Sequence, residues 1–135
     1  MQITRETDYA VRCILYLSKS PDRVAMAGEI ARENKIPKSF LAKIIQKLTK
    51  AEILSSFRGA KGGVRLARKP GSISLLDVIE TIEGDVGMNL CAVDKRACGQ
   101  SRGCAVHPVW VEIRSKTEKL LKGYKFDKLA GGRSK

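Results

Sequence analysis

Four residues that can bind metal ions lie close together in the C-terminal half of the chain: Cys91, Cys98, Cys104 and His107. The whole chain contains only 4 cysteines and 1 histidine, so this segment carries most of its soft ligands. Thiolates and imidazoles bind zinc and the iron of iron–sulfur clusters. In a reducing cytosol, clustered cysteines bind metals or react more often than they form disulfides. The segment therefore predicts a metal site or a group of reactive thiols.

The spacing of these residues does not by itself choose the cofactor. Six residues separate Cys91 from Cys98, five separate Cys98 from Cys104, and two separate Cys104 from His107. Structural zinc sites usually take ligands in pairs about two to four residues apart, which only Cys104 and His107 satisfy. Widely spaced thiolates can enclose a larger cofactor, and a histidine can complete its ligand set. Zinc, an iron–sulfur cluster and reactive thiols remain equal alternatives on the residues alone.

The chain is strongly basic, because 26 Lys and Arg residues stand against 14 Asp and Glu residues and give a formal net charge of +12. Most of the excess lies in the first half: residues 1–70 hold 15 basic and 6 acidic side chains, whereas residues 71–135 hold 11 and 8. A basic excess in one half favours a polyanionic partner such as nucleic acid. A solvated basic surface without a partner is the alternative.

The first half reads as three helices, because apolar residues recur at helical spacing in segments 4–20, 25–35 and 36–52. Pro37 suits the first turn of the third helix. One stripe of that helix is apolar, and the opposite face collects Ser39, Lys43, Gln46, Lys47 and Lys50. A short helix, a turn and a second helix with a basic face predict a helix-turn-helix, whose second helix enters the major groove of DNA.

Two short β-patterned runs, 53–57 and 64–67, follow the third helix. The turn between them holds three glycines, which allow the backbone angles of a tight hairpin. The hairpin carries Arg58, Lys61 and Arg65. A basic hairpin directly after a helix-turn-helix predicts the wing of a winged helix, and an ordinary charged surface hairpin is the alternative. Because the order of the elements and the position of the charges agree, the sequence favours DNA binding.

The remaining chain divides into a helix, a loop, a second helix and a tail. Ser74 and Asp77 have the spacing of a capping box, and Gly84 suits the end of that helix. We expect a winged helix-turn-helix domain over 1–84, a cysteine-rich cofactor loop over 85–107, a dimerisation helix over 108–125 and a flexible tail over 126–135. The dimerisation helix has a narrow apolar stripe that suits packing on its own core or on a second copy: Val109, Trp110, Ile113, Thr117, Leu120 and Leu121.

Other classes of protein are disfavoured. The single histidine has no visible nucleophile and orienting group beside it, so we do not expect an enzyme. The apolar runs are too short to span a membrane, and no secretion-signal pattern follows Met1. We therefore expect a soluble cytoplasmic protein with no membrane partner. Cys13, beside Ile14 on the first helix, is expected to be a small core residue.

The sequence resembles the IscR/NsrR family of winged-helix repressors that sense iron–sulfur clusters. The similarity is carried by "MQITRETDYAVR", "IPKSFLAKIIQKL", "SSFRGAKGGVRLAR", "ISLLDVIETIEG" and the spaced cysteines, and extends from Met1 to about Leu121. The resemblance implies a mainly α fold with a small β-hairpin wing and a C-terminal dimerisation helix. It also implies a homodimer, with the cluster near the dimer interface, whose affinity for double-stranded promoter DNA follows the state of the cluster.

The resemblance assigns Cys91, Cys98 and Cys104 as cluster ligands and leaves two candidates for the fourth. His107 matches the fourth ligand of the biogenesis regulators, which bind a two-iron cluster. Asp8 matches a carboxylate that nitric-oxide-sensing members contribute to a four-iron cluster across the dimer. The simpler roles are a charge at the start of the first helix for Asp8 and a helix cap for His107. Ala42 and Lys43 side with the nitric-oxide branch, so Asp8 and a four-iron cluster are favoured.

The resemblance also assigns Arg58 and Ser39 as DNA contacts. Ala42 stands where the biogenesis regulators have a glutamate used in operator selection, so a different operator is expected. The resulting hypothesis is a homodimeric transcriptional regulator, most simply a repressor, whose promoter affinity is controlled by a cluster sensing iron–sulfur status, redox conditions or nitric oxide. The alternative is a winged-helix regulator with a structural zinc, or with metal-free thiols that bind a partner protein.

Overall fold

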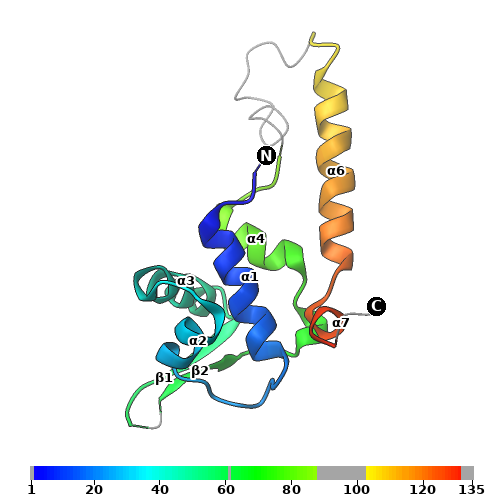
Figure 1. Ribbon diagram of the computed structural model, residues 1–135. Helices are drawn as coiled ribbons and strands as arrows, with labels where there is room; N and C mark the ends of the chain where they lie inside the picture. Colours follow the sequence, from blue (N-terminus) through cyan, green and yellow to red (C-terminus); the bar gives the residue numbers. More distant parts are fainter. Residues whose placement is uncertain (1, 61, 88–102, 132–135) are drawn as a thin grey trace.

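The computed structural model describes residues 2–60, 62–87 and 103–131, so Lys61, Cys91 and Cys98 lie outside the described residues. The described elements, drawn in Figure 1, are α1 (Arg5–Ser18), α2 (Ala27–Asn34), α3 (Lys38–Lys50), β1 (Leu54–Phe57), β2 (Gly63–Leu66), the 3-10 helix η1 (Pro70–Ser72), α4 (Leu75–Glu83), α6 (His107–Gly123) and α7 (Phe126–Ala130). The expected mainly α fold with a hairpin wing is confirmed. None of the described helices is both long and apolar enough to cross a membrane.

Side-chain caps define the starts of α1 and α4. The Thr4 hydroxyl accepts a hydrogen bond from the amide of Thr7 at 3.2 Å, which satisfies one of the free N–H groups at the start of α1. At α4, the Asp77 amide donates to the Ser74 hydroxyl at 3.1 Å and the Ser74 amide donates to the Asp77 carboxylate at 2.9 Å. The predicted capping box is therefore confirmed, and α4 ends before Gly84 as expected.

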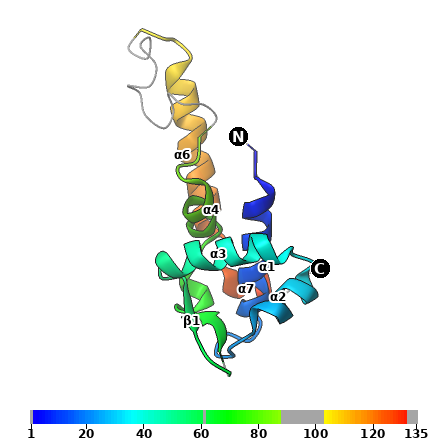
Figure 2. The ribbon, with the colours of Figure 1, turned by 90° about the vertical axis from the view of Figure 1, so that its left-hand side faces the viewer.

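The hydrophobic core of the N-terminal domain lies beneath α3. Leu41, Ile44 and Leu48 on one face of α3 are at most 1% exposed, and they pack in one core cluster with residues of α1, α2, α4 and the hairpin. Cys13 of α1 is also completely buried in this cluster, as the sequence predicted. Figure 2 shows α3 crossing in front of α1, with β1 below it. The apolar stripe of α3 thus faces the core and leaves the opposite face in solvent.

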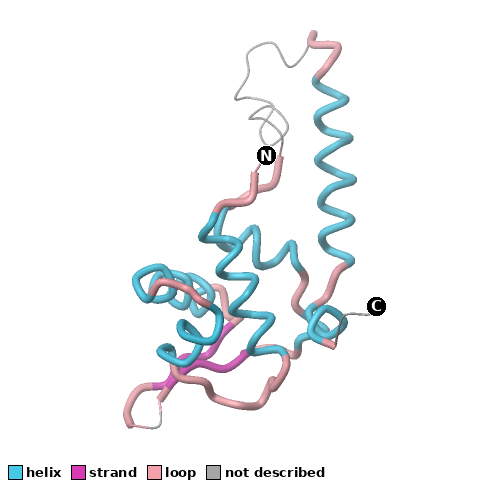
Figure 3. The backbone as a smooth tube through the Cα atoms, viewed as in Figure 1, coloured by secondary structure: helices cyan, strands magenta, loops and turns pink. Residues whose placement is uncertain are grey.

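The wing is a two-stranded antiparallel hairpin beneath the helices (Figure 3). Leu54 pairs with Leu66 and Phe57 with Gly63, and Leu54, Val64 and Leu66 point into the core. Val64 also exchanges two 2.8 Å backbone hydrogen bonds with Ala25, which ties the wing to the segment before α2. A Cβ atom at Gly63 would overlap the carbonyl oxygen of Ala25, so only glycine permits this close approach.

α6 is a 17-residue helix that packs against α4, and its N-terminal half projects away from the N-terminal domain (Figure 1). Leu121 packs on a small apolar cluster of Leu76, Ile79 and Val86. Other positions of the predicted stripe remain in solvent, with Val109 47% and Leu120 65% exposed. No residue of α6 is buried in the single chain. The stripe is therefore only partly used by the chain's own core.

The expectation of a flexible tail from residue 126 is wrong for residues 126–130. These residues form α7, in which Phe126 is fully buried against the core. The Phe126 amide donates to the Ile73 carbonyl at 3.0 Å, and the Leu75 amide donates to the Tyr124 carbonyl at 2.9 Å. The segment also packs against α1 and η1. One aromatic side chain and two backbone hydrogen bonds hold a stretch whose composition had suggested a frayed end.

Phe126→Ala should destabilise the domain by about 3–5 kcal/mol, because it removes a fully buried aromatic side chain and leaves a cavity. Urea unfolding followed by circular dichroism measures this change. Lys128→Ala, an exposed position in the same short helix, is the matched control and should change the free energy of unfolding little. Equal stability of the wild type and Phe126→Ala would mean that α7 is not part of the folded domain.

Candidate nucleic-acid interface and metal-binding segment

All five predicted reading residues of α3 are exposed to solvent: Ser39, Lys43, Gln46, Lys47 and Lys50. Lys43 and Lys50 take part in none of the ion pairs found within the described residues. Unpaired lysines on an exposed helix face are available to DNA phosphates. The helix that the helix-turn-helix pattern assigned to the major groove therefore carries free positive charge at its surface.

Lys47, the fifth predicted residue, lies on the flank of α3 that faces α1. Its ammonium group is 2.9 Å from the carboxylate of Glu6 in the first turn of α1. Two turns earlier on the same flank, Phe40 packs edge-to-face against Tyr9 of α1, with ring centroids 5.4 Å apart. Lys47 thus differs from Lys43 and Lys50, because its ammonium group is already paired with the carboxylate of Glu6.

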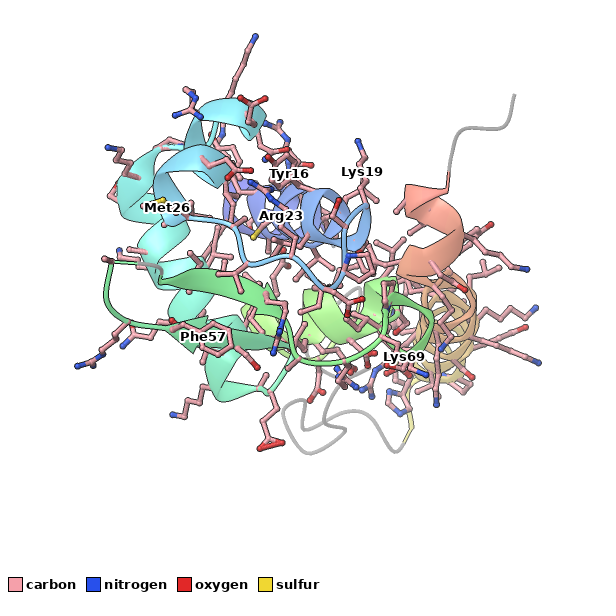
Figure 4. The ribbon with its side chains drawn as sticks, turned by 90° about the horizontal axis from the view of Figure 1, so that it is seen from below. Tyr16, Lys19, Arg23, Met26, Phe57 and Lys69 are labelled. Atoms are coloured by element: carbon pink, nitrogen blue, oxygen red, sulfur yellow. The ribbon has the colours of Figure 1, made fainter. Side chains whose placement is uncertain are left out.

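The hairpin presents an aromatic and cationic surface. Arg58 is exposed and takes part in none of the ion pairs of the described residues. The Arg65 guanidinium lies 5.2 Å from the centre of the Phe57 ring, whose exposed fraction is 41%. Figure 4 shows Phe57 on the hairpin in a view from below. Arg58 and Arg65 therefore both lie on the wing, as predicted, and Lys61 lies outside the described residues.

The loop before α2 is fixed by a cluster of three polar side chains. Arg23 forms two hydrogen bonds with the Glu29 carboxylate, both 2.7 Å long, and the Tyr16 hydroxyl donates to the same carboxylate. Tyr16 and Arg23 lie side by side in Figure 4. The hydrogen bonds from Arg23, and then from Tyr16, lower the pKa of Glu29 to about 2. Arg23 is therefore held in a structural ion pair that also positions α2.

Asp8, a candidate cluster ligand, lies on the exposed side of α1 in a shallow hollow with Tyr9 and Arg12. Its carboxylate is 2.9 Å from the guanidinium of Arg12. Arg12 in turn donates to the Asn34 carbonyl at 3.2 Å, at the end of α2, and lies over the Tyr9 ring. Asp8 is accessible from outside the chain but already has a cationic partner.

Cys104 and His107 occupy one turn at the start of α6. The His107 amide donates to the Cys104 carbonyl at 3.3 Å, and the Cys104 thiol is free and half-buried. His107 does not cap the helix with its side chain, because the N-cap is Val106 and no side-chain cap is present. Its Nδ1 atom is buried and has no hydrogen-bond partner among the described residues. A free thiol and an unsatisfied imidazole in one turn fit a metal-ligand pair.

The described residues alone contain no group of three His, Cys, Asp or Glu side chains that could hold a metal ion. Cys91 and Cys98, the other two predicted thiolate ligands, lie outside the described residues. Cys13 is not suited to bind a metal, because burial raises the pKa of its thiol to about 12 and so disfavours the thiolate. A buried thiol of this kind is inert.

Sequence reasoning missed Glu6, Phe57 and Phe40. Glu6 reads as an ordinary acidic residue in a first helical turn, and 41 positions separate it from Lys47. Phe57 reads as one apolar residue of a strand, although an exposed aromatic beside an arginine in a wing was a usable indication. Phe40 follows Ser39 on the reading helix, but only the packing of α3 on α1 places it against Tyr9.

Comparison with known proteins gives a match over nearly the whole chain. Residues 3–132 match the family described as "Rrf2: Iron-dependent Transcriptional regulator". A relative from Aquifex aeolicus, named an HTH-type transcriptional regulator, is 33% identical over 117 residues, which cover 85% of this chain and 81% of that protein.

Two solved structures have the same fold. CymR of B. subtilis, described as the global cysteine regulator, has a TM-score of 0.78 and 22% identity, and the match covers 99% of both chains. IscR of T. potens has a TM-score of 0.76 and 23% identity, over 98% of this chain and 89% of that one. At these identities the likeness concerns the fold and does not distinguish the signals that the proteins sense.

The Glu29 cluster should make part of the stability depend on acid pH. Because the folded-state pKa of Glu29 is lowered to about 2, its contribution is fully present above its unfolded-state pKa, about 4.3, and is lost as pH falls towards 2. Glu29→Gln should therefore be less stable than the wild type above about pH 5, with a difference that shrinks below about pH 4. Urea unfolding at each pH measures it. Glu33→Gln, with only a 3.7 Å contact to Arg32, controls for the lost charge, and a pH-independent difference for Glu29→Gln would contradict the prediction.

Proposed function

The chain belongs to the Rrf2 family and is a transcriptional regulator, and from this premise we propose that it is a homodimeric repressor whose affinity for promoter DNA is controlled by a bound iron–sulfur cluster. The observation that carries the proposal is the pairing of a free Cys104 thiol with the unsatisfied His107 imidazole in one turn, next to the segment that holds Cys91 and Cys98. The DNA-binding surface is the outward face of α3 together with the wing.

The DNA interface is supported by the distribution of free charge. Ser39, Gln46, Lys43 and Lys50 would face the major groove, and Arg58, Lys61 and Arg65 would contact the backbone or minor groove beside it. Serine and glutamine add hydrogen bonds to base edges, whereas lysine adds sequence-independent attraction to phosphates. Lys47 stands apart in this proposal, because Glu6 occupies its ammonium group in the free protein.

The ligand set is supported by its chemistry. Cys91, Cys98 and Cys104 would bind as thiolates, so that cofactor binding releases protons and depends on pH. The fourth ligand is His107 or Asp8 of the partner subunit. The buried, unpaired Nδ1 atom of His107 supports the first, whereas Asp8 must leave Arg12 before it can bind. When bound, an iron–sulfur cluster supplies redox-active iron that can respond to oxygen, nitric oxide or iron supply.

The exposed apolar residues of α6 support dimerisation through this helix, since Val109 and Leu120 lack cover in the single chain. Binding of the cofactor by residues 91–107 would then bias the relative positions of two reading helices. A tenfold change in DNA affinity requires a differential binding free energy of only about 1.4 kcal/mol. Modest reorientation is therefore sufficient for regulation.

Protein purified without oxygen should contain iron and acid-labile sulfide and should absorb above about 400 nm. Cys104→Ser should lose this absorption, and Cys13→Ala, which removes the inert core thiol, is the matched control and should keep it. Iron analysis of His107→Ala and Asp8→Ala identifies the fourth ligand. The resemblance favoured Asp8, but the unpaired Nδ1 atom of His107 and the pairing of Asp8 with Arg12 lead us to expect loss with His107→Ala and retention with Asp8→Ala.

The reverse pattern would assign the site to Asp8 of the partner subunit and a cluster shared across the dimer. Colourless protein with about one zinc per chain would instead support the structural-zinc alternative. Colourless protein without metal would leave the thiol segment as a site for a partner protein, and would exclude the cluster proposal.

Lys50→Gln should weaken binding to every duplex sequence and reduce the slope of log affinity against log salt concentration by about 0.9, because one phosphate contact is lost. Fluorescence anisotropy with labelled duplex DNA over a salt series measures both quantities. Lys119→Gln, which removes one exposed charge from α6, is the control. Identical salt-dependence slopes for Lys50→Gln and the wild type would show that Lys50 of α3 does not contact DNA phosphate, and would contradict the proposed interface.

A further inference from the structure

The ion pair between Glu6 and Lys47 joins an acidic residue of α1 to the edge of the reading helix. The two charged atoms are 2.9 Å apart, and the side chains of Lys47 and Glu6 are 44% and 24% exposed. The pair is thus beside the surface that would meet DNA, and it is not buried in the core. Lys43 and Lys50, on the outward face of the same helix, have no comparable partner among the described residues.

The positions of the two residues in their helices reinforce the pair. Glu6 lies in the first turn of α1, where the helix dipole favours a negative charge. Lys47 lies in the last turn of α3, where it favours a positive charge. The Phe40 and Tyr9 rings pack two turns away on the same flank and keep the two helices at a fixed separation. The carboxylate is therefore held in reach of the lysine.

The ion pair between Glu6 and Lys47 contributes little to holding α3 in its position. Leu41, Ile44 and Leu48 already anchor that helix, each at most 1% exposed. An exposed ion pair adds little stability beside such burial. Its larger effect is electrostatic, because a carboxylate in contact with the ammonium group takes the place that a DNA phosphate oxygen would occupy.

We propose that Glu6 is an internal substitute for a DNA phosphate, which occupies Lys47 and thereby limits sequence-independent binding. The inference rests on the proposed DNA interface. Sequence-independent affinity grows with every phosphate contact, whereas discrimination comes from base contacts. Holding one lysine of the reading helix in an intramolecular pair lowers affinity for all DNA while leaving Ser39 and Gln46 free to read bases. Glu6 is in this sense a residue that determines specificity without touching DNA.

The test uses the full-length protein and a labelled duplex of arbitrary sequence, with anisotropy measured over a series of salt concentrations. Glu6→Gln should bind this DNA about fivefold to tenfold more tightly near 0.1 M salt, with a salt dependence steeper by about 0.9, because Lys47 gains one phosphate contact. Adding Lys47→Gln to Glu6→Gln should remove the gain. Equal thermal unfolding midpoints would show that the variants fold alike.

Two matched controls remove the same charge without freeing a lysine of the reading helix. Glu52→Gln acts just beyond the end of α3, where Glu52 is exposed and forms no ion pair with another described residue. Glu112→Gln breaks a similar 3.0 Å pair with Lys116, on α6. Both should change affinity by less than about twofold.

Unchanged or weaker binding by Glu6→Gln would overturn the inference, and so would an equal gain in Glu52→Gln. If Lys50→Gln still reduces the salt dependence in that case, the DNA interface stands and only the role of Glu6 is wrong. If neither Lys50→Gln nor Glu6→Gln alters binding, the proposed interface is wrong, and the role of Glu6 is wrong with it.

Discussion

The burial of one face of α3 is the constraint on which the rest of the structure depends. Leu41, Ile44 and Leu48 cannot leave the core without exposing large apolar area, so the rotation of α3 about its own axis is fixed. That rotation alone places Lys43 and Lys50 in solvent and Lys47 beside α1. The same face packs on β1, so the wing also takes its position from these residues.

α4 links the N-terminal domain to the segment that carries the predicted cofactor ligands. It packs against α1 and α3 on one side and against α6 on the other, and it leads directly into the segment that carries the cysteines. The Glu83 carboxylate at its end accepts hydrogen bonds from the amide and hydroxyl of Thr4, which begins α1. The end of α4 is therefore joined to the start of α1 by these hydrogen bonds, and backbone hydrogen bonds beside α7 hold the opposite end of α6 in place.

Local features of the fold could be predicted because local chemistry determines them. The Ser74 and Asp77 capping box, the inward stripe of α3 and the glycine-rich hairpin turn all depend on residues within a few positions of one another. The partners of Lys47 and Phe126 could not be predicted, because Glu6 and Ile73 are distant in sequence and meet only after the core has formed. The helical pattern predicted that the candidate reading residues are exposed. It did not predict which of them form ion pairs.

The net charge of +12 overstates the charge available to DNA. Arg12, Arg23 and Lys47 each lie within 3.0 Å of a carboxylate, and all three acids belong to α1 or α2. The pair of Lys47 and Glu6 joins α3 to α1, the pair of Arg23 and Glu29 fixes the loop before α2, and the pair of Arg12 and Asp8 lies within α1. Lys43, Lys50 and Arg58 remain unpaired among the described residues. Charge is thus divided between fixing the framework and attracting phosphate. A protein that left every cation free would bind all DNA more tightly and distinguish its operator less well, because the added attraction carries no sequence information.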